Sequence, residues 1–319
     1  MKVAVLGLGS AGRRHARNLL ARSVTVTAYD PAPTDPPEGV ILANGVESAL
    51  DGVQAAVIAS PNTEHAAHAM AALERGIPVL VEKPLAVDAD SAQEIVRMAA
   101  ERHVSAAVAM NLRFHPALLA LRELHESGVL GRLHLAQVSF GYDLRRWREG
   151  DYRQSYSARS DLGGGILLDA IHEIDEILWL AGPVDEVSAE CTHASGLEID
   201  VEDLAVALLR FRTGALGLVD LNYFEASYRR GCLLVGDEAT ARWDWMAGTI
   251  TVDAISSSHT IDVAADVHDT YEAVIDDFLG AVGAGRPPRT SLAEGLAAVR
   301  VCEAIKLAAS SGRRVSLAG

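Results

Sequence analysis

The chain has 319 residues, of which 49% are hydrophobic and 22% charged, and its formal net charge is −15. This length and composition are typical of a globular protein with two domains. The negative charge argues against nucleic acid and anionic membranes as partners, but not against a small anionic ligand in a locally basic pocket.

No apolar run approaches the roughly 20 residues that a membrane-spanning helix needs. The N-terminus enters a strand pattern at once, so we expect no signal peptide. Three widely spaced cysteines, Cys191, Cys232 and Cys302, are expected to be reduced. We therefore expect a cytoplasmic protein that does not bind membranes.

Strand-like and helix-like segments alternate in the first part of the chain. Strands are predicted at 2–8, 24–29, 55–59, 79–81 and 105–110, and helices at 11–22, 63–75 and 90–102. Alternation of this kind is typical of βαβ units in a parallel sheet. We assign 1–117 to an N-terminal Rossmann domain.

The pattern changes after residue 115. A linking helix is predicted at 116–126, a strand at 133–140, a helix at 166–180, and helices at 269–282 and 292–309 close the chain. Strands are predicted at 185–191, 204–211, 215–222, 230–235, 239–245 and 249–254. Their short connections indicate an antiparallel meander. We assign 118–319 to a substrate-binding α/β domain and consider that the last helix, 291–309, packs back on the N-terminal domain.

A glycine-rich loop joins the first predicted strand to the first helix. Gly7, Gly9 and Gly12 form a G-x-G-x-x-G pattern, and Ser10 and Ala11 open the helix. In this context the glycines allow a tight turn, close approach of a pyrophosphate, and close packing of helix and strand. Asp30 ends the second strand, where a carboxylate binds the ribose hydroxyls of NAD and disfavours NADP. The alternative is an ordinary glycine-rich turn.

Several motifs occur together along the chain. They are Ser60-Pro61-Asn62-Thr63-Glu64-His65, Glu82-Lys83-Pro84, Asn111-Leu112-Arg113-Phe114-His115-Pro116, and Gly163-Gly164-Gly165 followed by Asp169, His172 and Asp175. With the glycine-rich loop, this combination resembles the glucose–fructose oxidoreductase / inositol dehydrogenase family (Gfo/Idh/MocA). The segments 151–158 and 169–175 are similar to a branch found in cell-surface sugar biosynthesis.

The resemblance implies a Rossmann domain and an α/β domain with a large, open, mostly antiparallel sheet that often forms a homodimer or homotetramer interface. It implies that NAD is the cofactor and that Ser60, Pro61, Asn62, His65, Glu82, Lys83 and Arg113 help to bind it. Lys83 and His172 match the family's catalytic lysine and histidine, and Asp169 matches its acidic residue. The family often has three residues between that aspartate and the histidine, whereas this chain has two, Ala170 and Ile171.

The residue types suit alcohol oxidation. Histidine accepts or donates a proton near neutral pH, so His172 suits the role of acid and base. With helical spacing, Asp169 and Glu176 lie on the same helix face as His172. The alternative to a catalytic role is that this face is simply polar and exposed to solvent. Lys83 ends a strand of the Rossmann sheet, where its ammonium would bind the reacting oxygen, above a Pro84 that permits a cis peptide bond. Asp175 projects to the apolar side of the same helix, so we weigh a structural role for it equally with a catalytic one.

The segment 145–159 is rich in arginine and aromatic residues. It holds Arg145, Arg146, Arg148, Arg153 and Arg159 together with Trp147, Tyr152 and Tyr156. As substrate-binding residues we select Lys83, Arg113, Arg153, Tyr156, Asp169 and His172. Arginines would favour an anionic sugar or sugar nucleotide, with Gly163–Gly165 as a flexible connector. The equal alternative is a surface loop whose charges are balanced by Asp143, Glu149, Asp151 and Asp161.

The remaining candidates are interpreted as structural. His65 and His68 lack a carboxylate or cysteine at metal-ligand spacing, so we predict no metal site. His15 is expected to pack near the cofactor, and Trp243 and Trp245 to share one sheet face in a core or a subunit interface.

The leading functional hypothesis is hydride transfer between NAD and a secondary alcohol or ketone of a sugar, polyol or nucleotide-sugar derivative. One alternative is an NAD-retaining glycosidase or epimerase that borrows and returns the hydride. Another is a non-catalytic NAD-binding protein, which the presence of both Lys83 and His172 disfavours.

Overall fold

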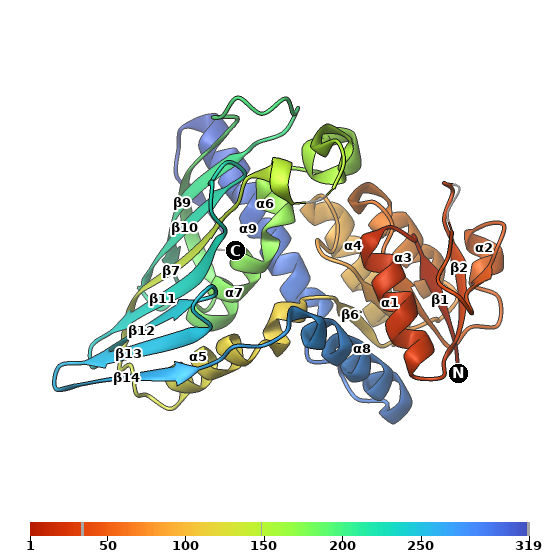
Figure 1. Cartoon of the computed structure of the whole chain (residues 1–319), viewed down its shortest axis with the longest axis horizontal. Helices are drawn as coiled ribbons and strands as arrows, with labels where there is room; N and C mark the ends of the chain where they lie inside the picture. The colour runs from red at the N-terminus through yellow and green to blue at the C-terminus, as the bar shows by residue number, and fades with distance from the viewer. Residues whose placement is uncertain (33–34, 148, 318–319) are drawn as a thin grey trace. The chain divides into compact units, whose positions relative to one another are not determined.

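The computed structural model describes residues 1–32, 35–147 and 149–317, and the chain divides into two compact units (Figure 1). The first unit comprises Met1–Asn111 and His268–Val299, and the second comprises Leu112–Val267 and Arg300–Gly319. Helix α9 (Leu292–Ser311) therefore contributes its first part to one unit and its second part to the other.

The first unit contains a parallel six-stranded sheet. Its strands lie in the order β3 (Ile41–Leu42), β2 (Thr25–Tyr29), β1 (Lys2–Leu6), β4 (Ala55–Ile58), β5 (Val79–Val81) and β6 (Ala106–Val108). The helices are α1 (Ser10–Ala21), α2 (Val46–Ala49), α3 (His65–Leu73), α4 (Ala89–Glu101) and α8 (Val267–Ala284), with the 3-10 turn η1 (Asn62–Glu64). The turn η2 (Asn111–Phe114) begins at Asn111 of this unit and continues into the second. The predicted Rossmann domain is confirmed. Because the strand order reverses between β1 and β4, a ligand crevice is expected at the carboxyl ends of these two strands.

The second unit is built on a nine-stranded sheet. The strands lie in the order β14 (Ser257–Asp262), β13 (Thr249–Ala254), β12 (Ala239–Asp244), β11 (Arg229–Gly236), β7 (Leu133–Gly141), β10 (Leu216–Asn222), β9 (Leu204–Phe211), β8 (Val184–Thr192) and β15 (Val315–Ser316). Only β7 and β10 pair in parallel among these neighbours, so the large, mostly antiparallel sheet is confirmed.

The predicted simple meander is wrong at one point. β10 and β11 follow each other in sequence but do not pair, because β7 lies between them. β7 pairs in parallel with β10 and antiparallel with β11. A strand inserted from earlier in the chain cannot be inferred from the short connection between β10 and β11.

Helices cover one face of this sheet (Figure 1). The second unit holds α5 (Pro116–Glu126), α6 (Ile166–Asp169) and α7 (Ile171–Ala181), and four 3-10 turns, η3 (Leu144–Arg146), η4 (Tyr152–Gln154), η5 (Tyr156–Ala158) and η6 (Ser160–Leu162). α7 packs on β7 and β10. The single helix predicted at 166–180 is wrong, since the backbone at Ala170 (φ −94°, ψ 30°) separates α6 from α7.

In the described ranges, no helix lies over the opposite face of the sheet (Figure 1). Three apolar residues of that face are exposed to solvent. Their exposed fractions are 41% for Val206 and 43% for Leu208 in β9, and 36% for Leu216 in β10. Among the helices that the structure describes, none has both the length and the apolar character needed to cross a membrane.

Candidate functional site

The glycine-rich loop after β1 has the geometry of a dinucleotide cradle. Gly7 has a φ of +93°, and a Cβ built there would overlap the backbone of Ala59 and Ser60. A Cβ on Gly12 would overlap the carbonyl oxygen of Gly7. A Cβ on Gly9 would meet nothing within 4 Å. Gly7 and Gly12 are thus required by the fold itself, whereas the space beside Gly9 is open to a ligand.

The start of α1 adds hydrogen-bond donors to this cradle. Gly9 is the N-cap of α1, without a side-chain cap, and the first turn holds no acidic residue. The N–H groups of a first helical turn lack intrahelical acceptors and carry a partial positive charge, which suits a pyrophosphate.

Asp30 lies beside the same loop. Its Oδ2 accepts a hydrogen bond from the Leu8 N–H (2.6 Å), and its Oδ1 accepts one from the Ala32 N–H (2.9 Å). A carboxylate has about four lone-pair positions, so both oxygens retain acceptor capacity for ribose hydroxyls. The residues of this unit therefore fit a bound NAD.

The segment after β4 is held by two histidines. His65 is buried, with Nδ1 2.7 Å from the Pro84 carbonyl oxygen and Nε2 3.0 Å from the Ser60 carbonyl oxygen. Burial lowers the pKa of His65, although both backbone contacts oppose the change. A neutral ring has one donor, and the shorter distance favours donation from Nδ1 to Pro84. His65 thereby joins the ends of β4 and β5.

His68 has a contact that its sequence pattern did not indicate. Its Nδ1 lies 2.9 Å from the hydroxyl oxygen of Ser60. Burial lowers the pKa of His68, while the charge of Glu64 opposes this. A neutral His68 accepts a hydrogen bond from the Ser60 hydroxyl and so orients the Ser60 side chain at the carboxyl end of β4.

Glu82-Lys83-Pro84 follows β5, and the Lys83–Pro84 peptide bond is cis, as the sequence allows. Glu82 is buried, and its Oε1 lies 2.6 Å from His15 Nε2 while its Oε2 accepts a hydrogen bond from the Lys83 N–H. Burial acts to raise the pKa of Glu82, but the hydrogen bonds and charges of His15 and Lys83 together outweigh it and lower this pKa. The pair fixes the turn that carries Lys83. His15 therefore has a specific partner beyond general packing.

In the second unit, Asp169 and His172 are buried together with Glu176, so the solvated polar face considered for them is wrong. Asp169 ends α6 and His172 lies in the first turn of α7, on either side of the break at Ala170. Tyr156 donates its hydroxyl to Asp169 Oδ1 (2.5 Å), and Tyr223 donates to Oδ2 (3.0 Å).

Asp175 forms a buried ion pair with Arg113. Arg113 Nε is 2.8 Å from Oδ2 and Nη2 is 2.6 Å from Oδ1. The guanidinium also lies 5.3 Å from the centre of the Trp179 ring. The structural role considered for Asp175 agrees with this bidentate geometry, which connects α7 to the turn at Arg113. Binding of cofactor or substrate by Arg113 stays a prediction.

Two further glutamates of α7 are buried. Glu173 Oε1 is 2.6 Å from Arg230 Nε, and the Arg230 guanidinium lies over the rings of Phe140 (4.8 Å) and Trp245 (5.3 Å). Burial, reinforced by the negative charge of Glu173, raises the pKa of Glu176 to about 8. Glu176 is therefore mostly protonated at neutral pH. The sequence pattern did not single out Glu173, Arg230 or Tyr223, because each depends on a strand far away in sequence.

The tryptophans behave as expected for core residues. Trp243 is buried, and the rings of Trp243 and Trp245 are 5.6 Å apart. Both lie against His115, whose pKa is lowered to about 4 by burial and by the charge of Arg230.

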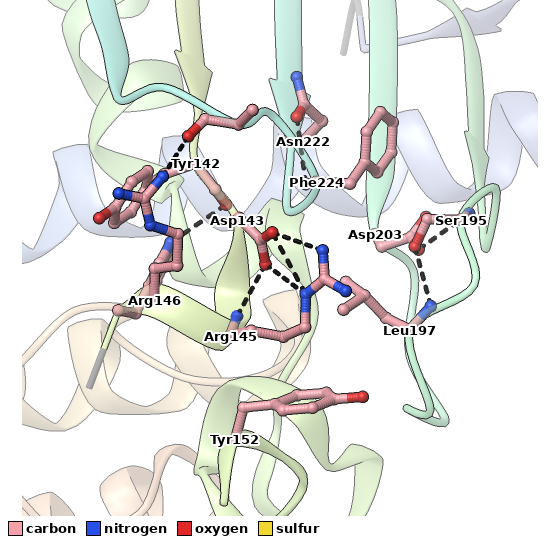
Figure 2. Close-up of polar contacts among 12 residues, drawn as sticks. Tyr142, Asp143, Arg145, Arg146, Tyr152, Ser195, Leu197, Asp203, Asn222 and Phe224 are labelled. Carbon is pink, nitrogen blue, oxygen red and sulfur yellow. Dashed lines mark hydrogen bonds and ion pairs between the residues drawn. The ribbon is translucent and has the colours of Figure 1, made fainter. Parts of the chain in front are cut away.

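The arginine-rich segment forms ion pairs with its own acidic neighbours. Arg145 pairs with Asp143 (Figure 2), Arg153 with Asp151 and Glu198, and Arg159 with Asp161. Arg146 donates to the Ala226 carbonyl oxygen (2.5 Å) and lies 5.6 Å from the Tyr142 ring centre. Arg148 lies outside the described residues. The geometry of the described arginines thus supports the charge-balanced alternative.

The loop between β8 and β9 holds this segment in place. Asp203 organises that loop by accepting hydrogen bonds from the Ala194 and Ser195 N–H groups and the Ser195 hydroxyl, part of which Figure 2 shows. Asp200 accepts from the N–H and hydroxyl of Ser160, and the Glu198 N–H donates to the Tyr152 hydroxyl.

Gly163, Gly164 and Gly165 form a packed turn and not the flexible connector predicted from their sequence. A Cβ on Gly164 would overlap the Tyr156 carbonyl oxygen, and one on Gly165 would overlap the Glu202 carboxylate. Gly165 has a φ of +108°, and its N–H donates to the Ser157 carbonyl oxygen.

The structure therefore gathers the predicted residues into two groups. Gly7, Gly9, Ser10, Ala11, Gly12, Asp30, Ser60, Pro61, Asn62, His65, Glu82 and Lys83 belong to the first unit, and Arg113, Arg153, Tyr156, Asp169 and His172 belong to the second. Tyr156 and Asp169 are in direct contact, while Arg153 is exposed and paired with two carboxylates. Within the described residues, His, Cys, Asp and Glu side chains form no group of three or more suited to a metal ion.

Comparison with known proteins places both units in one family. Residues 1–110 match the oxidoreductase family model with an NAD-binding Rossmann fold, and residues 118–242 match the GFO/IDH/MocA C-terminal domain. Inositol 2-dehydrogenase of Rubrobacter xylanophilus is 30% identical over 332 residues, which cover 97% of this chain and 91% of that protein. UDP-N-acetylglucosamine 3-dehydrogenase of Acidithiobacillus ferrooxidans is 27% identical over 320 residues, which cover 95% of each.

The fold of the chain is also similar to that of a dehydrogenase of known structure. Levoglucosan dehydrogenase in complex with NADH and levoglucosan superimposes with a TM-score of 0.90 over the full length of both chains, at 21% identity. With the NAD cradle and the matched models on both units, the chain belongs to the Gfo/Idh/MocA family of NAD-dependent oxidoreductases.

Proposed function

We propose that this enzyme catalyses reversible hydride transfer between NAD and a secondary alcohol or ketone of an uncharged sugar or polyol. The observation that carries the proposal is the cradle at Gly7–Gly12, which keeps open space beside Gly9 in a chain that also carries a buried His172. The relatives named above act, by their names, on inositol, on a nucleotide sugar and on levoglucosan, so alcohol groups of sugar-like molecules are the common chemistry.

The two candidate catalytic residues have complementary chemistry. We assign His172 to take the hydroxyl proton during oxidation and return it during reduction, since imidazole titrates near neutral pH. We assign Lys83 to bind the reacting oxygen, where a positive charge stabilises developing negative charge. Bound NAD supplies the hydride acceptor. Glu82 and His15 support Lys83 by fixing the turn that carries it.

An uncharged substrate agrees with the charges of the second unit. Arg145, Arg153 and Arg159 are each bound to carboxylates of their own surroundings. If these arginines bound a phosphate or carboxylate of the substrate, their present ion pairs would have to break. We therefore favour a neutral sugar or polyol over the anionic sugar considered from the sequence.

The test measures absorbance at 340 nm with NAD and matched pairs of neutral sugars or polyols and their uronic acids, with nucleotide sugars as a third group. NADH formation with a neutral compound supports the proposal, whereas a preference for the acid or the nucleotide contradicts the substrate class. Lys83→Met and His172→Asn should each lower kcat by about a thousandfold or more, with the Kd of NAD nearly unchanged. No NADH with any group, despite tight NAD binding, would overturn the dehydrogenase assignment.

We further propose that copies of the chain associate through the uncovered face of the nine-stranded sheet. The exposed apolar side chains of Val206, Leu208 and Leu216 support this, because a contiguous apolar patch favours association. Leu208→Glu should shift the molar mass measured by light scattering toward that of the monomer. A monomeric wild-type protein would contradict the proposal.

A further inference from the structure

Glu82 is a buried carboxylate directly before the candidate catalytic lysine. Its Oε1 lies 2.6 Å from His15 Nε2 on α1, and its Oε2 accepts a hydrogen bond from the Lys83 N–H at 3.1 Å. Because an ionised carboxylate only accepts hydrogen bonds, the contact with His15 is a donation from Nε2. Glu82 therefore has a donor on each oxygen, one from a helix and one from the backbone of Lys83.

Glu82 keeps its negative charge in spite of burial. Burial acts to raise its pKa, but His15 and Lys83 outweigh this and hold the pKa below its ordinary value. His65 of α3 is also close enough to feel the Glu82 charge, and burial lowers the pKa of His65, so that this ring is neutral near pH 7. From α8, the Tyr271 ring meets the His15 ring at 6.4 Å. Near pH 7 the buried carboxylate is therefore ionised.

The charge of Glu82 acts in turn on Lys83. An electrostatic attraction is shared by both partners, so the Lys83 charge that lowers the pKa of Glu82 is matched by a preference of Lys83 for its ammonium form. Since Glu82 is buried, solvent and salt screen this attraction less than they screen a surface pair. Lys83 is itself half-buried, which by desolvation alone would favour the neutral amine.

We propose that Glu82, held by His15, is a positioning residue whose negative charge keeps Lys83 as an ammonium that donates to the reacting oxygen and does not serve as the base. The part of Lys83 in turnover rests on the proposed function. A Glu82 that only fixed the turn would tolerate the loss of its charge but not a change of its shape. Charge and shape can therefore be separated by substitution.

The test uses two variants of the full-length enzyme and a control. Glu82→Gln removes the charge but keeps the shape, because the amide oxygen can accept from the Lys83 N–H while the amide nitrogen donates to the His15 ring. Glu82→Asp keeps the charge but shortens the side chain. Glu94→Gln, exposed on α4, controls for the loss of one carboxylate elsewhere in the same unit. All other contacts of Lys83 are common to these proteins.

The first measurement follows the lysines directly. The chain has three, Lys2, Lys83 and Lys306, so reductive ¹³C-methylation and NMR can resolve each one. In Glu82→Gln, Lys83 should lose its proton at a pH lower by about one unit or more than in the wild type. In Glu82→Asp and Glu94→Gln the midpoint should move by less than about half a unit. Lys2 and Lys306 are internal controls and should keep their midpoints in every variant.

The second measurement is the pH profile of turnover. The alkaline limb of kcat/KM for the sugar should move to lower pH by about one unit or more in Glu82→Gln. In Glu82→Asp this limb should stay in place, and kcat should fall at every pH because the turn that carries Lys83 is altered.

Three results would overturn the inference. One is an unchanged Lys83 midpoint in Glu82→Gln, and another is an equal movement of Lys2 and Lys306, which would indicate a general change of structure. The third needs no variant and decides the matter if Glu82→Gln does not fold. In the wild type Lys83 should lose its proton at a pH no lower than Lys2, whose ammonium is at the surface, and an earlier loss would contradict the proposal.

Failure of the proposed function is recognised separately. If the wild-type enzyme forms no NADH but the Lys83 midpoint falls in Glu82→Gln alone, the effect of Glu82 on Lys83 stands and the dehydrogenase assignment fails. If NADH forms but the Lys83 midpoint is the same in Glu82→Gln and the wild type, the dehydrogenase assignment stands and this inference fails.

Discussion

The cofactor cradle and the buried polar groups of the second unit are built in different ways. The cradle is made mainly of backbone, from neighbouring residues between Gly7 and Gly12. The second unit relies on side chains that meet across long sequence separations: 54 residues for Tyr223–Asp169, 57 for Arg230–Glu173 and 62 for Arg113–Asp175. Binding of a common cofactor thus depends on local chain geometry, whereas the surroundings of His172 depend on tertiary pairing.

The largest expected effect is a difference between substitutions of two cradle glycines, Gly12 and Gly9. In Gly12→Ala the new Cβ overlaps the Gly7 carbonyl oxygen, so we expect both a lower melting temperature and roughly a hundredfold weaker NAD binding or worse. In Gly9→Ala we expect an unchanged melting temperature but at least tenfold weaker NAD binding, since only the ligand needs that space. Circular dichroism and calorimetry measure the two quantities. Wild-type affinity in Gly9→Ala would contradict our placement of the pyrophosphate.

The Arg113–Asp175 ion pair allows a test of how much the buried polar groups of the second unit contribute to stability. Arg113→Ala removes a counter-ion from a buried carboxylate, so the free energy of unfolding should fall by about 3–5 kcal/mol. Arg97→Ala is the control, because the Arg97–Glu101 pair is exposed on α4 and its loss should not change the stability measurably. Equal stability of both variants in urea would show that the buried pair is not structural.

The protonation of Glu176 should make stability depend on pH. Folded Glu176 keeps its proton until about pH 8, whereas the unfolded side chain loses it near its ordinary pKa of 4.5. The folded state therefore binds more protons in this window, and raising the pH destabilises the wild type. Glu176→Gln removes this pH dependence, so the stability of the variant relative to the wild type should grow from pH 4.5 to pH 8 and then level off at about 5 kcal/mol.

Urea unfolding at several pH values measures this difference. Glu94→Gln, on the exposed face of α4, provides the control and should show no such trend. A constant difference between Glu176→Gln and the wild type across the window would mean that Glu176 is ionised in the folded protein.

The smallest expected effect concerns cofactor choice. Asp30→Ser removes the negative charge that disfavours the 2′-phosphate, so the preference for NAD over NADP should fall by roughly 10- to 30-fold. Asp30→Asn removes the charge but keeps an oxygen that can accept from the Leu8 N–H. The ratio of kcat/KM for the two cofactors is the measurement. If only the serine variant changes the ratio, Asp30 acts through the loop conformation and not through its charge.

Much of the fold was predictable from the sequence. The parallel strands of the first unit are short apolar runs, and the strands at 204–211 and 249–254 were predicted with the bounds that the structure has. The break at Ala170 was not predictable, because both sides of it carry helical patterns and the deviation appears only in the backbone angles. The position of β7 between β10 and β11 likewise depends on which apolar edges meet.

Some features of the candidate site could likewise be predicted from the sequence, and others could not. The sequence by itself determined the cofactor cradle, because the positive φ of Gly7 and the close approach of Gly12 to the Gly7 carbonyl are features of the local backbone. It also selected Lys83, Asp169 and His172 through their motifs. Only the tertiary structure decided that Asp169 is bound by Tyr156 and Tyr223, that Arg113 neutralises Asp175, and that Glu176 is protonated. The physical reason is that hydrogen-bond partners and burial, which set the charge of a carboxylate, come from strands and loops distant in sequence.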